Sequence, residues 1–180
     1  MPRLFGNRIV LREYQDSDIE HINQWVNDTE ITNTLSDNFL YPHSKHETES
    51  FFKMMVEGKS NNKSFIIGIK DSLEYLGQID LYKIDWKNRF ASLAIVIGKK
   101  EYLGKGYGNE AIRVLLKFAF EELNLNRIEL EVYEYNERAY KCYVKCGFKE
   151  EGRYRKKIYK KGKYWDSVCM SILRGEFEQE

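Results

Sequence analysis

The chain has 180 residues, of which 29 are basic and 28 acidic, so its formal net charge is +1. That length suits one domain with a real core, and 10 Phe, 13 Tyr and 3 Trp supply apolar area that disordered chains lack. No apolar run reaches the roughly 20 residues of a membrane span, the first residues lack a signal peptide's apolar segment, and near-neutral charge disfavours a dedicated nucleic-acid binder. We therefore expect one soluble, cytoplasmic domain over residues 1–180, without a membrane or nucleic-acid partner.

The first third of the chain predicts one strand and two helices. Residues 8–12 (RIVLR) have strand character, and 27–43 lack a clear period, which indicates a loop or a short irregular helix. Two segments have the form of a capping box, Ser17–Glu20 and Ser44–Glu47. Each is followed by apolar residues at helical spacing, and the second helix is expected to end near Gly58.

The rest of the chain alternates between strand and helix patterns. Three β-rich runs come first, then a helix, a strand, a shorter helix and a final hairpin. The predicted order is β-α-α-β-β-β-α-β-α-β-β, and its later elements are strands 64–70, 74–84 and 90–97, helix 108–123, strand 127–133, helix 136–146, and strands of about 149–159 and 164–173.

Cysteine and histidine spacing disfavours a metal centre. Cys142, Cys146 and Cys169 are an odd number and cannot form a complete disulfide framework. The three histidines lie far upstream of these cysteines, whereas a zinc site needs four well-spaced ligands. We expect no metal cofactor.

A glycine cluster stands where the helix over 108–123 begins. In Leu103-Gly-Lys-Gly-Tyr-Gly-Asn109, three glycines let the backbone approach a ligand, and the free N–H groups of a helix start attract an anion such as a pyrophosphate. A Walker loop fails because Gly106 follows Lys105 where Ser or Thr is needed. A dinucleotide fingerprint (Gly106-x-Gly108-x-x-Ala111) fits only in part, because the loop after the preceding strand is too long. A glycine loop without a ligand remains open.

Two segments resemble the acetyl-CoA motifs of the GNAT superfamily of N-acetyltransferases, namely IGKKEYLGKGYGNEAI (97–112) and YNERAYKCYVKCGF (135–148). The opening IVLREYQDSDIEHINQW and the tail EEGRYRKKIYKKGKYWDSVCMSIL resemble the branch that holds ribosomal-protein N-terminal acetyltransferases and spermidine/spermine acetyltransferases. The resemblance implies an α/β (α+β) fold with a central, mostly antiparallel sheet splayed into a V and flanked by helices. It also implies direct transfer of acetyl from acetyl-CoA to a primary amine, either a polyamine or a peptide amino terminus, and it is compatible with a homo-oligomer.

The resemblance also assigns site residues. Tyr143 stands at the position of the general acid, although as one of 13 tyrosines it could simply pack beside Tyr140. Two positions depart from the family pattern, because Leu103 replaces Gln or Arg and Ser92 replaces a Glu; the base is therefore left open among Ser92, Glu131 and Glu134. The residues implied to bind acetyl-CoA are Ile95, Val96, Ile97, Leu103, Gly104, Lys105, Gly106, Tyr107, Gly108, Asn109, Asn136, Arg138, Ala139 and Tyr140.

Charge is segregated along the chain. Residues 13–49 hold nine acids against Lys45, and residues 141–163 hold ten Lys or Arg against two Glu. These are either two solvated faces, or an acidic vestibule for a cationic acceptor beside a basic region near the CoA phosphates. Two rival functions stay open: an acyl-CoA-binding regulatory module without turnover, and a nucleotide-dependent oxidoreductase.

Overall fold

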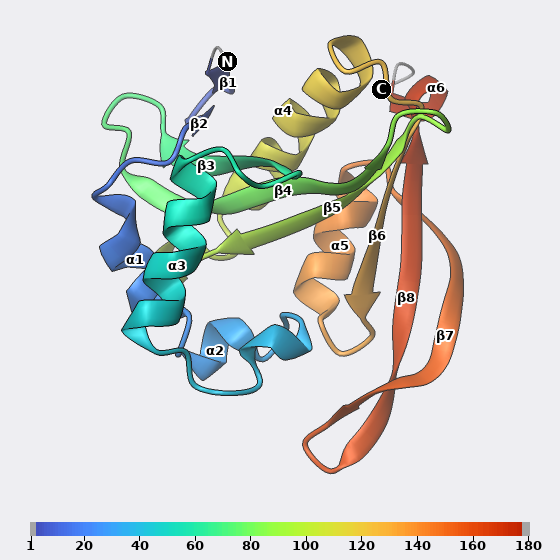
Figure 1. The fold of residues 1–180 in the computed structure, drawn as a ribbon. Coiled ribbons are helices and arrows are strands. Elements are labelled where there is room, and N and C mark those ends of the chain that lie inside the picture. Colours follow the sequence, from blue (N-terminus) through green and yellow to red (C-terminus); the bar gives the residue numbers. More distant parts are fainter. Residues whose placement is uncertain (1–2, 178–180) are drawn as a thin grey trace.

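The computed structural model describes residues 3–177, which form one eight-stranded sheet with helices on both faces (Figure 1). The strand order across the sheet is β1-β2-β3-β4-β5-β6-β8-β7. Along the chain the elements are β1 (Leu4–Phe5), β2 (Ile9–Arg12), α1 (Asp18–Trp25), α2 (Thr29–Thr32), η1 (Asp37–Phe39), α3 (Lys45–Val56), β3 (Lys63–Ile69), β4 (Tyr75–Asp85), β5 (Phe90–Ile97), η2 (Lys100–Tyr102), α4 (Tyr107–Glu121), β6 (Arg127–Tyr133), α5 (Glu137–Lys145), β7 (Lys149–Lys160), β8 (Lys163–Leu173) and α6 (Arg174–Phe177).

The sheet splays at its centre. Neighbouring strands are antiparallel except β5 and β6, which are parallel and pair only between residues 90–92 and residues 127–129. Beyond Ser92 and Glu129 the two strands diverge, as Figure 1 shows. The expected mostly antiparallel, V-shaped sheet is confirmed.

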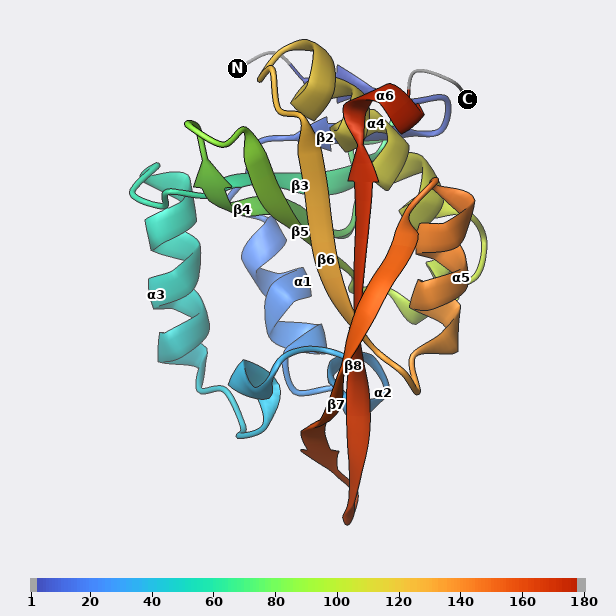
Figure 2. The same ribbon diagram turned by 90° about the vertical axis from the view of Figure 1, so that its right-hand side faces the viewer.

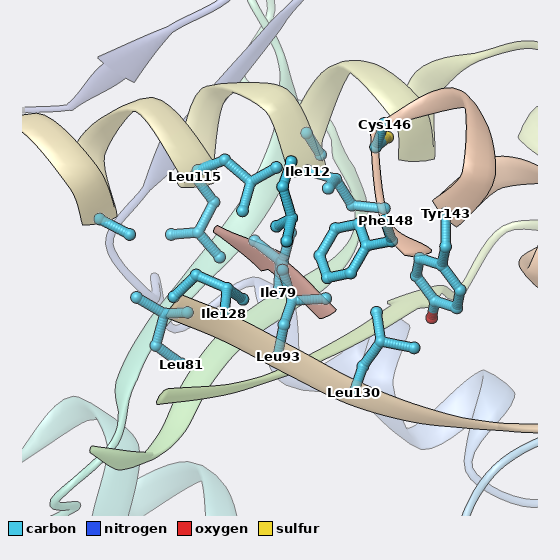
Figure 3. Close-up of a cluster of buried hydrophobic side chains, with 14 of the residues drawn as sticks. Ile79, Leu81, Leu93, Ile112, Leu115, Ile128, Leu130, Tyr143, Cys146 and Phe148 are labelled. Carbon is cyan, nitrogen blue, oxygen red and sulfur yellow. The ribbon is translucent and has the colours of Figure 1, made fainter. Parts of the chain in front are cut away.

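Each face of the sheet has its own core. Helix α4 buries a continuous apolar stripe against β2–β6, because its residues at helical spacing (Ile112, Leu115 and Ala119 among them) are fully buried. Figure 3 shows this core, with Ile79 and Leu93 of the sheet below α4 and Phe148 at its edge. A smaller cluster under α1 and α3 covers the opposite face (Figure 2).

The predicted elements all occur in the predicted order, but one helix start is built differently. At α3 the capping box is present, with Ser44 and Glu47 exchanging side-chain and backbone hydrogen bonds. At α1 Ser17 forms no side-chain cap. Instead the carboxylate of Asp18 is buried, accepts from the Gln15 backbone N–H at 2.8 Å and binds Arg12 through two hydrogen bonds of 2.7 and 2.8 Å. A buried ion pair overrides the local capping pattern there.

The β7–β8 hairpin extends past the other elements in both views (Figures 1 and 2). Side chains of β7 are exposed almost throughout, and those of β8 become buried only from Ser167 onward. We call residues 153–165 the hairpin arm. No helix within residues 3–177 is both long and apolar enough to cross a membrane.

Candidate active site

A cavity of about 1760 Å³ opens where β5 and β6 diverge. Its walls include the end of β5, the loop before α4, the start of α5 and the α2–η1 segment. The cavity therefore reaches from the α4 side of the sheet to the side that α1 and α3 cover.

The end of β5 offers backbone groups to this cavity. Ile95, Val96 and Ile97 line it, and each pairs with β4 on one side only. Their other backbone edge faces the gap, where an extended ligand could add as a further strand.

The glycine loop closes one end of the cavity. Gly104 and Gly106 have φ values of +72° and +86°, which side chains rarely adopt, and Gly106 is the N-cap of α4. No side chain among the described residues caps the first turn of α4, and its first backbone bond is Glu110 N to Gly106 O at 3.1 Å. The N–H groups of the preceding turn are thus available to an anion at the positive end of the helix dipole.

The structure brings most of the predicted cofactor residues together. Lys105 and Tyr140 are the exceptions, because neither lines the cavity, and the Tyr140 hydroxyl donates to Glu150 at 3.0 Å. Asn136 caps α5 by accepting from the Ala139 N–H at 3.3 Å, so it has the structural role as well as a place on the wall. The predicted cofactor residues on the wall are Ile95, Val96, Ile97, Leu103, Gly104, Gly106, Tyr107, Gly108, Asn109, Asn136, Arg138 and Ala139.

These features fit acetyl-CoA. A pyrophosphate would meet the glycine loop, and a pantetheine arm would meet the open edge of β5. At Gly104 an added Cβ would meet no heavy atom within 4 Å, so a ligand has room to approach that backbone. Bound there, acetyl-CoA supplies a thioester-activated acetyl group.

Tyr143 lies at the inner end of the cavity. Its ring is buried against Phe148, with centroids 5.8 Å apart, and Figure 3 shows its hydroxyl oxygen pointing away from α4. Burial raises the pKa of Tyr143, with smaller contributions from the nearby Cys142 and Cys146 thiols. The phenol therefore stays protonated at physiological pH and can act only as a proton donor.

The three base candidates differ in position. Glu134 and Ser92 do not line the cavity, and Glu134 Oε1 is occupied by the Asp166 N–H at 2.8 Å. Glu131 does line it, but it accepts hydrogen bonds from Lys157 at 2.8 Å and from Ser167 at 2.7 Å. Partial burial raises the pKa of Glu131, and these bonds outweigh burial, so that the pKa lies below its ordinary value. Glu131 is ionised, but it is a weak base.

The acidic segment does not form a multiply charged wall. Of the nine acids in residues 13–49, only Asp37 lines the cavity. Five others are engaged locally: Glu13 by Arg3, Asp18 by Arg12, Asp28 and Glu30 by Lys100, and Glu47 as the α3 cap. Short-range pairing therefore consumes most of the charge that the sequence concentrates here.

The structure adds wall residues that sequence reasoning missed. Arg8 stacks over the Tyr107 ring at 4.4 Å and donates to the Lys105 carbonyl at 3.1 Å, which supports the glycine loop from a distant strand. Tyr82 and Tyr133 form an aromatic wall on the side of Asp37. Their strands were predicted, but nothing in a strand's own pattern reports which gap it will face. Within residues 3–177 no group of three or more His, Cys, Asp or Glu could hold a metal ion.

Comparison with known proteins agrees with this geometry. The model of the acetyltransferase (GNAT) domain matches residues 8–149. The SPbeta prophage-derived uncharacterized N-acetyltransferase YokL of Bacillus subtilis is 29% identical over 96% of this chain and 94% of its own length. The "Putative ribosomal N-acetyltransferase YdaF" of the same organism is 38% identical over 63% of both chains.

A solved structure resembles the whole fold. The spermidine N-acetyltransferase of Vibrio cholerae, crystallised with CoA and spermine, superposes with a TM-score of 0.83 over 96% of this chain and 99% of that one, at 26% identity. The family match spans well over half of the chain, and the relatives are N-acetyltransferases. The chain therefore belongs to the GNAT acetyltransferases and is an N-acetyltransferase that uses acetyl-CoA.

Proposed function

We propose that this enzyme acetylates a primary amine that carries a single ammonium group, such as the amino terminus of a peptide, by direct transfer from acetyl-CoA. The observation that carries the proposal is the charge of the acceptor side, where Asp37 is the one cavity-lining acid of the segment 13–49. Glu131, the nearest carboxylate across the gap on β6, is already neutralised by Lys157. A polyamine needs several carboxylates, whereas a lone ammonium needs one.

Tyr143 has the role of general acid in this proposal. An attacking amine must be neutral, and because an alkylammonium has a pKa of about 10, it loses its proton to solvent in the open cleft before or during attack. The departing thiolate needs a proton in turn, and Tyr143 donates one from the buried end of the cavity. The amine enters from the side of Asp37, Tyr82 and Tyr133, so both reactants can meet in the gap without a covalent enzyme intermediate.

The relatives support two acceptor classes. The Vibrio cholerae structure holds spermine, which favours a polyamine, and the name of YdaF favours a ribosomal protein. The aromatic walls and single free carboxylate of this chain favour the second class, because a peptide backbone can extend along Tyr82 and Tyr133 once its amino terminus is at Asp37.

An acceptor panel tests the proposal. Release of the CoA thiol is measured with a tripeptide that has a free amino terminus, with the same tripeptide N-formylated, and with spermidine. We expect the free tripeptide to have the highest kcat/KM, and the formylated one to be inert. Higher kcat/KM with spermidine contradicts the single-ammonium proposal and leaves acetyl transfer itself intact.

Variants locate the ammonium site. Asp37→Asn should lower kcat/KM for the tripeptide about tenfold, chiefly through KM, because an ion-paired hydrogen bond is lost. The matched control is Glu20→Gln, which neutralises an exposed acid of the same segment outside the cavity and should change little. Equal effects of the two variants would show that only the general charge of the segment matters.

A further inference from the structure

The hairpin arm concentrates positive charge that the whole-chain value hides. Between residues 153 and 165 the chain holds seven Lys or Arg and no Asp or Glu. Because the net charge of the chain is +1, the rest of the protein has a net charge of −6 (1 − 7). The molecule is therefore strongly polarised.

Most of this charge is unpaired. Lys157 binds Glu131, and Arg153 binds Glu150. The other five cations have no acidic partner among the described residues, and they lie on the two strands and the turn of the arm: Arg155, Lys156, Lys160, Lys161 and Lys163. All but Lys160, which is partly buried, are exposed.

Aromatic rings alternate with these cations. Tyr154, Tyr159 and Tyr164 are between 52% and 61% exposed, although rings of that size are usually covered. Tyr159 and Tyr164 form a cross-strand pair with centroids 4.9 Å apart, and the Lys163 ammonium lies 3.5 Å from the Trp165 ring centroid. Exposed rings beside unpaired cations are the features with which proteins hold unpaired bases and phosphates.

We propose that the hairpin arm is a docking surface for single-stranded or looped RNA. Charge complementarity requires a polyanion and disfavours a second copy of this chain, because two arms would bring seven positive charges against seven. Side chains of both faces of β7 are exposed and charged, with no exposed aliphatic side that could enter a bilayer. Unpaired RNA also offers free base faces to the tyrosines, which duplex DNA does not.

The position of the arm gives this surface a use. Lys157 and Ile158 line the cavity, so the arm begins at the wall of the acceptor cleft and extends away from it (Figure 1). RNA bound there would hold an associated protein close to the cleft. This use rests on the proposed peptide acceptor, whereas RNA binding itself does not.

Fluorescence anisotropy of a labelled 12-nucleotide single-stranded RNA with the full-length enzyme tests the proposal. With up to five phosphate contacts we expect a slope of log K against log salt of about −3.5, that is, roughly a hundredfold weaker binding between 50 and 200 mM salt. Lys160→Gln, Lys161→Gln and Lys163→Gln combined should weaken binding at least tenfold and reduce that slope to about −1.4. Tyr159→Leu should weaken RNA binding several-fold with no change in slope.

A matched control uses three other exposed lysines. Lys45, Lys53 and Lys59 have side-chain exposures of 80%, 74% and 71%, and the same triple change to Gln there should leave RNA binding unchanged. Release of the CoA thiol with a free tripeptide should be the same in both triple variants, which separates RNA docking from acetyl transfer. Equal loss in the two triple variants, no binding of RNA, stronger binding of vesicles containing phosphatidylserine, or an arm-dependent dimer in solution would each overturn the proposal.

Discussion

The ammonium of Lys157 lies 2.8 Å from Glu131 Oε2, so that the hairpin arm reaches back and neutralises a carboxylate on the wall of the cleft. Ser167 donates to the same oxygen at 2.7 Å. These bonds hold the pKa of Glu131 below its ordinary value against the opposing effect of burial. A carboxylate stabilised in this way binds an extra proton poorly.

Replacing Glu131 should therefore affect chemistry only modestly. We expect Glu131→Gln to change kcat by less than tenfold, whereas loss of a true general base costs 10²–10⁴. The measurement is kcat with saturating amine between pH 6 and 9. A drop of a hundredfold or more, together with loss of the acidic limb of the pH profile, would identify Glu131 as the base.

The hydroxyl of Tyr143 is the group whose removal should cost most. Tyr143→Phe should lower kcat by about 10²–10⁴ if the phenol donates the leaving-group proton. Acetyl-CoA binding should be unchanged, because the ring that packs on Phe148 remains. Stopped-time assays of CoA release give kcat, and calorimetric titration with acetyl-CoA gives the affinity.

Tyr140 provides the control for that experiment. It lies on the same helix, but its hydroxyl donates to Glu150 outside the cavity. Tyr140→Phe should keep wild-type kcat to within about threefold. Similar losses in both variants would mean that α5 tolerates no change of this kind, and Tyr143 would then have only a packing role.

Local sequence patterns predicted the element order well, because each depends on neighbours in the chain. Helix α4 follows from apolar residues at helical spacing, and α3 follows from the box formed by Ser44 and Glu47. The divergence of β5 and β6 came from family resemblance, since no local pattern shows where parallel pairing stops.

Long-range contacts explain what the sequence could not predict. Ser17 does not cap α1, because Asp18 turns inward to Arg12. The acidic segment 13–49 suggested a charged vestibule, but Lys100 binds Asp28 and Glu30 from a position about seventy residues away. A count of charges along the chain cannot register such pairs.

The glycine loop allows a ligand-specific test of the acetyl-CoA site. Acetyl-CoA at a hundred times its dissociation constant should stabilise the fold by roughly 2.7 kcal/mol, which raises Tm by a few degrees in a protein of this size. Gly106→Val should abolish that rise, because φ is +86° there and a Cβ would already lie 3.2 Å from Arg8 Nη2. The measurement is a thermal shift with and without acetyl-CoA.

Gly58 separates backbone strain from loss of the site. Its φ is +66° and a Cβ there would meet nothing within 4 Å, so Gly58→Val introduces comparable strain far from the cleft. Its Tm without ligand should fall, whereas its shift with acetyl-CoA should persist. If Gly106→Val also keeps the full shift, the loop does not hold the pyrophosphate.

Asp80 gives the fold a pH dependence of its own. It lies on the face of β4 that also holds Gln78, whose amide donates to the Tyr14 hydroxyl at 2.9 Å. Burial raises the pKa of Asp80 to about 6 from an ordinary 3.8. The folded state thus holds this proton more tightly than the unfolded state, so that the stabilisation is complete below pH 3.8 and is lost as pH rises through 6.

Asp80→Asn should isolate this effect, because the amide keeps the shape of the carboxyl group and never ionises. From pH 4 to pH 8 the free energy of unfolding of the wild type should fall by about 2 kcal/mol relative to the variant, since two pKa units correspond to nearly 3 kcal/mol and part of the loss occurs below pH 4. Glu13 and Glu151, whose pKa values arginine partners lower to about 2, contribute mainly below pH 4.5 and do so equally in both proteins. Urea unfolding at several pH values measures the difference, and a constant difference across that range would show that Asp80 ionises as freely in the folded protein as in the unfolded chain.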